Sequence, residues 1–247
     1  MYIRRPDNMF HLIFAESALE LVPDEIRGHP AVRNQAQRSG KRPTEDILDG
    51  TFHHSAMKRL DNWEQRGRPD IIHMSLLVSQ GSILNREGHL RTYIHTINNE
   101  LIEVDPKTRL PRNLERFKGL ISKLLLEGEL KGRTEEAGTE LLKLTKLMTI
   151  EKILEKIAPD KVYALDDRQT IMTFKKVLRS DGLGPKDLEK MNIALIVGAF
   201  PHGEFKINLS KLASKVFSIY GDTLELWTVV SNILIDAERA LGLSGSD

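Results

Sequence analysis

The chain contains no cysteine among its 247 residues. Disulfide bonds, thiolate zinc sites and cysteine nucleophiles are therefore excluded, and any catalysis must use other groups. Long apolar runs are also missing, because the longest stretch without a polar side chain is about eight residues, 193–200. A membrane-spanning helix needs about 20 apolar residues, and the amino terminus has no apolar stretch of signal-peptide length. We therefore predict a cytoplasmic protein with no membrane partner.

Net charge is nearly absent, since 36 Lys and Arg residues oppose 35 Asp and Glu residues and leave +1. Binding of a nucleic acid would have to depend on local clusters of basic residues. One cluster lies within 27–42, which has no acidic residue and contains Arg27, Arg33, Arg38, Lys41 and Arg42. Gly, Pro and small polar residues surround these side chains, so the segment is predicted to be a flexible basic insertion at about 27–45.

A second basic cluster lies within 107–123, where Glu115 is the only acidic residue. Its basic members are Lys107, Arg109, Arg112, Arg116, Lys118 and Lys123. Pro111 suits the first turn of a helix, and apolar residues follow at helical spacing. We therefore expect Arg112 and Arg116 to share one helical face, with Arg109 in the preceding loop. Such a face can equally be a solvated surface without a ligand.

The remaining pattern alternates strands with helices, which predicts a single α/β domain over 1–247. Strands are predicted at 9–15, 70–77, 141–146, 161–165, 192–198 and 216–219, and helices at 16–21, 149–157 and about 223–241. A hairpin at about 89–104, turning at Asn98-Asn99, is expected as an addition to the main sheet. His73, inside an apolar run, is interpreted as a hydrogen-bonded core histidine.

Three loops follow the last three predicted strands, at 166–167, 199–203 and 220–223. Ligands of open α/β sheets bind beyond the carboxyl ends of the strands, so these loops are the expected pocket. Gly198, Gly203 and Gly221 would let backbone groups approach a flat ligand, although tight turns would also explain them. No G-x-G-x-x-G follows a strand, no P-loop is present, and the eight histidines lack metal-ligand spacing. We predict neither a Rossmann nucleotide site nor a metal.

The pentapeptide Arg66-Gly67-Arg68-Pro69-Asp70 precedes the predicted strand 70–77. Pro69 favours an extended Arg68, and residues two apart in an extended chain point the same way. Asp70 can therefore hold the Arg68 guanidinium in a bidentate pair and direct it toward an anion or a nucleobase carbonyl. Taken alone, the pentapeptide would more simply be a surface salt bridge that contributes less than about 1 kcal/mol.

Five segments together carry a resemblance to a known family. They are RGRPDIIH at 66–73, LRTYIHT at 90–96, TRLPRNLERF at 108–117, GAFPHG at 198–203 and SIY at 218–220. In this order they resemble the EMG/NEP family of small-subunit rRNA pseudouridine-N1-specific methyltransferases, in its short archaeal form. The resemblance extends from Phe10 to about Leu234. Ala199 departs from it, because archaeal members often have a second glycine there.

The resemblance implies a SPOUT-type α/β knot: a mostly parallel sheet flanked by helices, with a C-terminal trefoil knot. It also implies a homodimer that binds S-adenosyl-L-methionine, without metal, in the knot loops at the subunit interface. By motif, the RNA-contacting residues are Arg68, Arg109, Arg112 and Arg116, and Asp70 steadies the first of them. The implied cofactor-binding residues are Leu165, Gly198, Gly203, Phe217, Ser218, Ile219, Tyr220 and Leu224.

The expected activity is methylation of N1 of a pseudouridine in small-subunit rRNA during ribosome biogenesis. Without cysteine, direct in-line attack is the consistent mechanism. Arg68 would stabilise negative charge on the base, Asp70 would position Arg68, and the other arginines would bind phosphates. One alternative is a ribosome-assembly factor that binds rRNA and assembly proteins, with methylation secondary. Another is methylation of a ribose 2′-hydroxyl.

Overall fold

The computed structural model describes residues 9–131 and 140–244. Within these ranges eight strands form one sheet in the order β4-β5-β3-β2-β1-β7-β6-β8. The strands are β1 (Met9–Ser17), β2 (Leu90–Thr96), β3 (Leu101–Val104), β4 (Glu129–Lys131), β5 (Glu140–Thr145), β6 (Lys161–Leu165), β7 (Asn192–Gly198) and β8 (Lys215–Phe217). Along this order, neighbouring strands in the half β2-β1-β7-β6-β8 pair in parallel. Neighbouring strands in the half β4-β5-β3-β2 pair antiparallel. This confirms the α/β class with a mostly parallel sheet.

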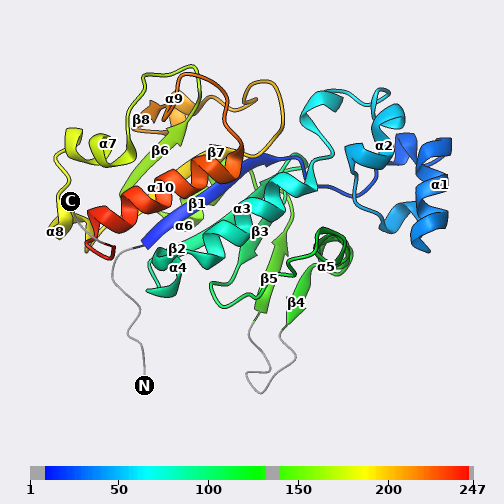
Figure 1. Cartoon of the computed structure of the whole chain (residues 1–247), viewed down its shortest axis with the longest axis horizontal. Helices are drawn as coiled ribbons and strands as arrows, with labels where there is room; N and C mark the ends of the chain where they lie inside the picture. Colours follow the sequence, from blue (N-terminus) through cyan, green and yellow to red (C-terminus); the bar gives the residue numbers. More distant parts are fainter. Residues whose placement is uncertain (1–8, 132–139, 245–247) are drawn as a thin grey trace.

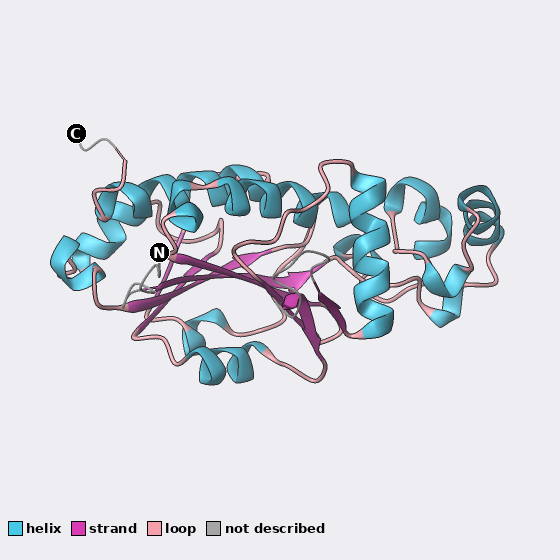
Figure 2. Cartoon of the chain, turned by 90° about the horizontal axis from the view of Figure 1, so that it is seen from below, coloured by secondary structure: helices cyan, strands magenta, loops and turns pink. Residues whose placement is uncertain are grey.

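Helices cover both faces of the sheet (Figures 1 and 2). One face packs against α3 (Pro69–Gly81), α4 (Ile83–Arg86), α5 (Leu114–Glu127), α7 (Phe174–Ser180), α8 (Pro185–Leu188) and α10 (Leu226–Ala240). The opposite face packs against α6 (Ile150–Ile157) and α9 (Leu209–Leu212). Of the helices described, none is sufficiently long and apolar to span a bilayer.

The predicted strand 70–77 is wrong, because this segment lies inside helix α3. A short apolar run cannot be assigned to strand or helix by periodicity, and here both the sheet and α10 cover it. Pro69 at the first helical position and Asp70 in the first turn are the signals that favour the helix. The interpretation of His73 as a core residue is confirmed, since its Nε2 donates to the Pro111 carbonyl at 2.7 Å and its ring stacks on Phe117.

The predicted helix at 16–21 is also absent, because β1 continues to Ser17 and irregular backbone follows. The N–H groups there bond to distant carbonyls instead of forming helical turns. Ala18 donates to Ala199 at 2.9 Å, and Val22 donates to Asp46 at 2.9 Å. Glu16 has a positive φ of 51°, which turns the chain at this point. The segment therefore joins the first strand to the loop after β7.

The basic segment at 27–45 is not a flexible loop but part of a folded helical insertion, residues 22–65. It contains η1 (Asp24–Ile26), α1 (Pro30–Ser39), η2 (Pro43–Glu45), α2 (Gly50–Met57) and η3 (Trp63–Gln65). The insertion has its own small apolar core, made by Val22, Ile26, Val32, Leu48, Ala56, Met57 and Leu60. It lies at one side of the sheet (Figure 1). Pro30 begins α1, and Gly40, with φ 67°, ends it.

Several other boundaries follow the sequence closely. Thr149 caps α6 after β5, as predicted, and the hairpin turns at Asn99, whose φ is 55°. The hairpin is no addition, however, because β2 pairs with β1 in the centre of the sheet. Helix α5 begins at Leu114, with the Asn113 side chain as its cap, so Arg112 precedes the helix and shares no helical face with Arg116.

Candidate functional site

A cavity of about 460 Å³ lies where the loops after β6, β7 and β8 meet the beginnings of α3 and α10. This volume is within the range of small-molecule sites. Its walls combine charged and apolar side chains: Arg68, Asp166, Arg168, Glu204 and Glu225 beside Ile71, Val197, Ile219, Leu224 and Val229. The convergence of the three loops that was predicted from the strand ends is confirmed.

Seven of the eight predicted cofactor residues line this cavity. They are Leu165, Gly198, Gly203, Ser218, Ile219, Tyr220 and Leu224. Phe217 is not part of the lining, because its fully buried ring packs in the core against Phe174 at a centroid distance of 6.1 Å. Phe217 therefore supports the loop from behind.

Two glycines have little space for a side chain. A Cβ on Gly198 would lie 3.0 Å from the Phe205 ring and 3.1 Å from the Phe200 ring. Gly203 has a φ of 92°, and a Cβ there would lie 2.8 Å from Gln65 Nε2. Gln65, in η3, donates a hydrogen bond of 2.8 Å to the Glu204 carbonyl. The helical insertion thus contacts the loop after β7, where only glycine fits.

Side-chain bonds connect the three loops. Arg168 donates to both carboxylate oxygens of Asp166, at 2.9 and 2.8 Å, and also pairs with Glu204. The hydrogen bonds from Arg168 lower the pKa of Asp166. Thr223 Oγ1 donates to Asp167 Oδ2 at 2.6 Å. The loop after β6 is therefore bonded to each of the other two loops.

Arg68 reaches the cavity from its position just before α3. Its Nε and Nη2 donate to the two carboxylate oxygens of Asp70, both at 2.8 Å. Hydrogen bonding to Asp70 raises the pKa of Arg68. The predicted bidentate pair is confirmed, although Asp70 lies in a first helical turn and not in a strand. Within the described ranges Nη1 has no partner, which leaves a fixed N–H donor.

Arg109, Arg112 and Arg116 are exposed, and no acidic side chain of the described residues pairs with them. Arg109 and Arg112 lie in the loop before α5, and Arg116 lies in its first turn. The bond from His73 to the Pro111 carbonyl fixes this loop to α3, one turn after Asp70. The structure therefore links the loop that carries two arginines to the helix that carries the Arg68–Asp70 pair.

Comparison with known proteins places this arrangement in a family. Residues 12–238 match the model of the EMG1/NEP1 methyltransferases. The chain belongs to the EMG1/NEP1 methyltransferase family. Its fold matches the crystal structure of Archaeoglobus fulgidus Nep1 bound to S-adenosylhomocysteine, with a TM-score of 0.80 and 36% identity. That match covers 96% of this chain and 100% of the other.

Archaeal relatives in the EMG1/NEP1 family match nearly the whole chain. The ribosomal RNA small subunit methyltransferase Nep1 of Thermococcus kodakarensis is 43% identical over 235 residues, which cover 95% of this chain and 100% of that protein. The protein of the same name from Pyrococcus furiosus is 43% identical over 231 residues, with coverage of 92% and 96%. The resemblance found in the five sequence segments is confirmed.

Sequence reasoning missed two residues that shape this EMG1/NEP1 site. Glu16 is buried at the end of β1, and its carboxylate accepts the N–H groups of Lys206 and Ile207 at 3.0 Å. It therefore holds the far part of the loop after β7. Glu225 lines the cavity at the beginning of α10. The position of Glu16, an acidic residue directly after an apolar run, could have indicated a site residue. No comparable pattern in the sequence pointed to Glu225.

Proposed function

We propose that this chain transfers a methyl group from S-adenosylmethionine to N1 of a pseudouridine in small-subunit rRNA. The observation that carries the proposal is the position of Arg68, which Asp70 fixes at a cavity built from three loops, two of which contain glycine. Family membership supports the reaction class, because relatives are named rRNA small subunit methyltransferases and one solved relative is bound to S-adenosylhomocysteine.

The cavity suits S-adenosylmethionine in size and lining. Val197, Ile219 and Leu224 offer apolar surface for a flat adenine ring, and the tight approach at Gly198 brings backbone groups close. The residues that would hold the cofactor are Leu165, Gly198, Gly203, Ser218, Ile219, Tyr220 and Leu224, with Phe217 behind them. When bound, the cofactor supplies an electrophilic methyl group, and no metal is needed for this transfer.

Arg68 and Asp70 have distinct roles at the nucleobase. Pseudouridine N1 carries a proton that must leave as the methyl group arrives, so negative charge develops on the ring. Arg68, with Nε and Nη2 engaged by Asp70, presents Nη1 to a base carbonyl and stabilises that charge. Asp70 orients Arg68. Without cysteine the chain forms no thiolate adduct with the base, in keeping with direct in-line attack.

Arg109, Arg112 and Arg116 bind phosphates of the RNA. Phosphate contacts fix the position of an RNA without reading its sequence, and these three exposed cations are free to make them. The bond between His73 and the Pro111 carbonyl attaches the loop of Arg109 and Arg112 to α3 and keeps these two cations at a set position relative to Arg68.

A second copy of the chain completes the cytoplasmic enzyme as a homodimer, with the trefoil knot of the family in each subunit. Apolar side chains support this interface. Met74 on α3 is 43% exposed and Ile235 on α10 is 44% exposed, and these two helices pack together over one face of the sheet. Tyr220, which lines the cavity, and Ile171 are each more than half exposed and offer further apolar side chains for such an interface.

Methyl transfer to matched RNA hairpins tests the proposal. The protein is incubated with labelled S-adenosylmethionine and with hairpins that contain either uridine or pseudouridine, and the methylated nucleoside is mapped. Methylation at N1 of pseudouridine alone is the expected result. Transfer to uridine or to a ribose hydroxyl, or hairpin binding without turnover, would overturn it.

A further inference from the structure

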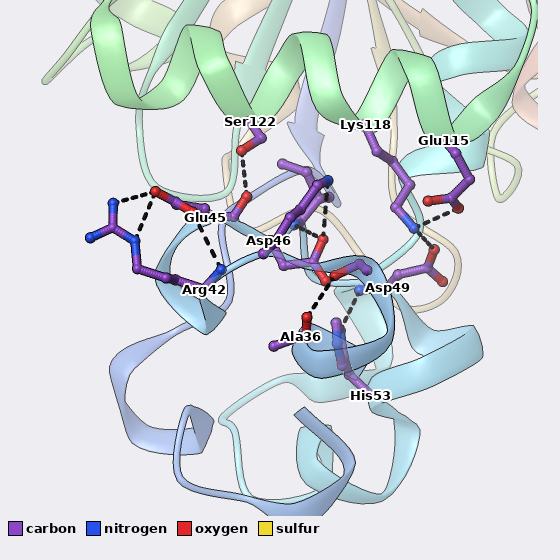
Figure 3. Close-up of polar contacts among 12 residues, drawn as sticks. Ala36, Arg42, Glu45, Asp46, Asp49, His53, Glu115, Lys118 and Ser122 are labelled. Carbon is purple, nitrogen blue, oxygen red and sulfur yellow. Dashed lines mark hydrogen bonds and ion pairs between the residues drawn. The ribbon is translucent and has the colours of Figure 1, made fainter. Parts of the chain in front are cut away.

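A buried ammonium group joins α5 to the helical insertion (Figure 3). Lys118 has a side chain only 2% exposed, and its Nζ donates to Asp49 Oδ2 at 2.8 Å and to Glu115 Oε1 at 2.9 Å. Nζ also lies 5.0 Å from the centre of the Phe52 ring. Asp49 is 8% exposed at its side chain, whereas Glu115 is 60% exposed. The pair with Asp49 is therefore the buried half of the contact.

Both Lys118 and Asp49 remain ionised inside the protein. Burial alone would lower the pKa of Lys118, but hydrogen bonds to Asp49 and Glu115 raise its pKa above the ordinary value. Burial alone would raise the pKa of Asp49, but Lys118 holds that pKa below the ordinary value. Lys118 therefore stays cationic and Asp49 anionic at neutral pH.

Asp49 is also connected to Arg68, through the backbone at the start of α2. Its Oδ1 accepts the Thr51 N–H at 2.9 Å and so caps α2. The next residue, Gly50, donates its N–H to the Gly67 carbonyl at 2.8 Å, immediately before Arg68. Gly67 has a φ of 67°, and a Cβ there would lie 2.7 Å from Met57. The backbone before Arg68 is thus packed directly against α2, at both its first residue, Gly50, and its last, Met57.

On its other side, Lys118 fixes the first turns of α5. Arg116 lies two residues before it, and the loop with Arg112 and Arg109 leads into the same turn. The Ser122 hydroxyl, one turn later, donates to the Glu45 carbonyl of the insertion. Helix α5 therefore contacts the insertion at two successive turns, and the charged contact is the one nearest the arginines.

From these contacts we propose that Lys118 and Asp49 are positioning residues that set the phosphate-binding arginines, in the first turn of α5 and in the loop before it, in register with Arg68. The inference rests on the proposed function. In this arrangement Asp49 joins two parts of one RNA site: through Lys118 it holds Arg116, and through Gly50 and Gly67 it holds Arg68. Because a misplacement of about 1 Å can cost about 100-fold in rate, register between the two parts controls turnover.

If Lys118 and Asp49 had a merely structural role, kcat would fall only as far as the folded fraction of the protein falls. Removing Lys118 alone would leave the buried carboxylate of Asp49 without its ion-pair partner and destabilise the fold, whereas replacing both members of a buried pair with uncharged groups is often harmless to stability. The double variant Asp49→Asn/Lys118→Met does this, and Asn keeps the cap of α2. It should therefore separate the stability of the fold from the register of the site.

The experiment compares wild type, Asp49→Asn, the double variant Asp49→Asn/Lys118→Met, and a control pair, Glu103→Gln/Lys156→Met. The control removes an ion pair between α6 and β3 that lies outside the cavity and outside the candidate RNA residues. Melting temperature, S-adenosylhomocysteine affinity, hairpin Kd and kcat at saturating pseudouridine hairpin are measured for each protein.

For the double variant we expect the melting temperature and S-adenosylhomocysteine affinity of wild type, hairpin Kd changed less than about threefold, and kcat reduced at least about tenfold. The control should match wild type in kcat. Wild-type kcat in the double variant would overturn the inference, as would a kcat loss explained by a smaller folded fraction. If the double variant does not fold, Asp49→Asn, which leaves Lys118 paired with Glu115, decides by the same criteria. An inactive wild type would instead refute the proposed function.

Discussion

Replacement of Asp70 by Asn tests whether Asp70 acts on the reaction only through Arg68. The side chains of Asp70 and Arg68 are 36% and 37% exposed, and such half-exposed pairs contribute less than about 1 kcal/mol to stability. In a domain of this size that corresponds to a melting shift below about 4 °C. Loss of one oriented donor to a developing charge, by contrast, typically costs about 100- to 1000-fold in rate.

The expected signature is therefore a large loss of methyl transfer with almost no loss of stability. Asp70→Ala and Arg68→Ala should each lower kcat, and the double variant should be little worse than either, because residues that act as one unit are non-additive. Single-turnover rates with pseudouridine hairpin, together with thermal melts, provide the measurement.

The pH profile separates orientation from proton transfer. If Asp70 only orients Arg68, Asp70→Asn should retain measurable turnover with a pH dependence of unchanged shape. If Asp70 accepts the N1 proton, that variant should lose nearly all turnover, keep RNA affinity, and change the shape of the profile. Full activity of Arg68→Ala at low RNA concentration would refute the assignment of this site and leave the pair as a surface salt bridge.

Three further predictions concern charge. Arg112→Ala and Arg116→Ala should each weaken hairpin binding by roughly 1 kcal/mol or more, flatten the slope of log K against log salt by about 0.7 to 0.9, and recover rate at saturating RNA. Arg33→Ser/Arg38→Ser should reduce the same slope without changing cofactor affinity, and an unchanged slope would exclude α1 from the RNA surface. Burial lowers the pKa of His11 to about 4, below the unfolded value of about 6.5; the unfolded chain binds more protons between these values, so stability falls as pH falls. His11→Phe should recover about 2 kcal/mol of the loss between pH 7 and pH 5 in urea titrations, and an equal loss in both proteins would contradict this.

The strand ends and the arginine motif could be predicted because they depend on local pattern. Apolar runs at 161–165 and 192–198 became β6 and β7, and their loops met as the topology rule requires. The Arg68–Asp70 pair was also predictable, since two residues so close in sequence meet in either an extended chain or a first helical turn.

What could not be predicted depends on contacts between distant residues. The segment predicted as a strand at 70–77 is helix α3, and its sequence resembled a buried strand because α10 and the sheet bury Ile71, Ile72 and Leu76 while the exposed position, Met74, is apolar as well. The basic residues of 27–42 are fewer in the free state than the local sequence suggests, since Asp24, Glu45 and Asp46 just outside the segment pair with Arg27, Arg42 and Lys41. Lys118 looked like one more surface cation, and only its meeting with Asp49, 69 residues away, buries it.

The strand order of the sheet determines when the sheet can form during synthesis of the chain. Strand β1 is synthesised before the other described strands, yet one of its two neighbours is β7, with Met9 opposite Asn192. The centre of the sheet therefore closes only after most of the chain has been synthesised, and closure over so long a loop is slow. The loops after β6, β7 and β8, which build most of the cavity, all come after residue 164 in the chain. A nascent chain thus exposes its basic residues to RNA well before it can hold a methyl donor, and the capacity to react comes last.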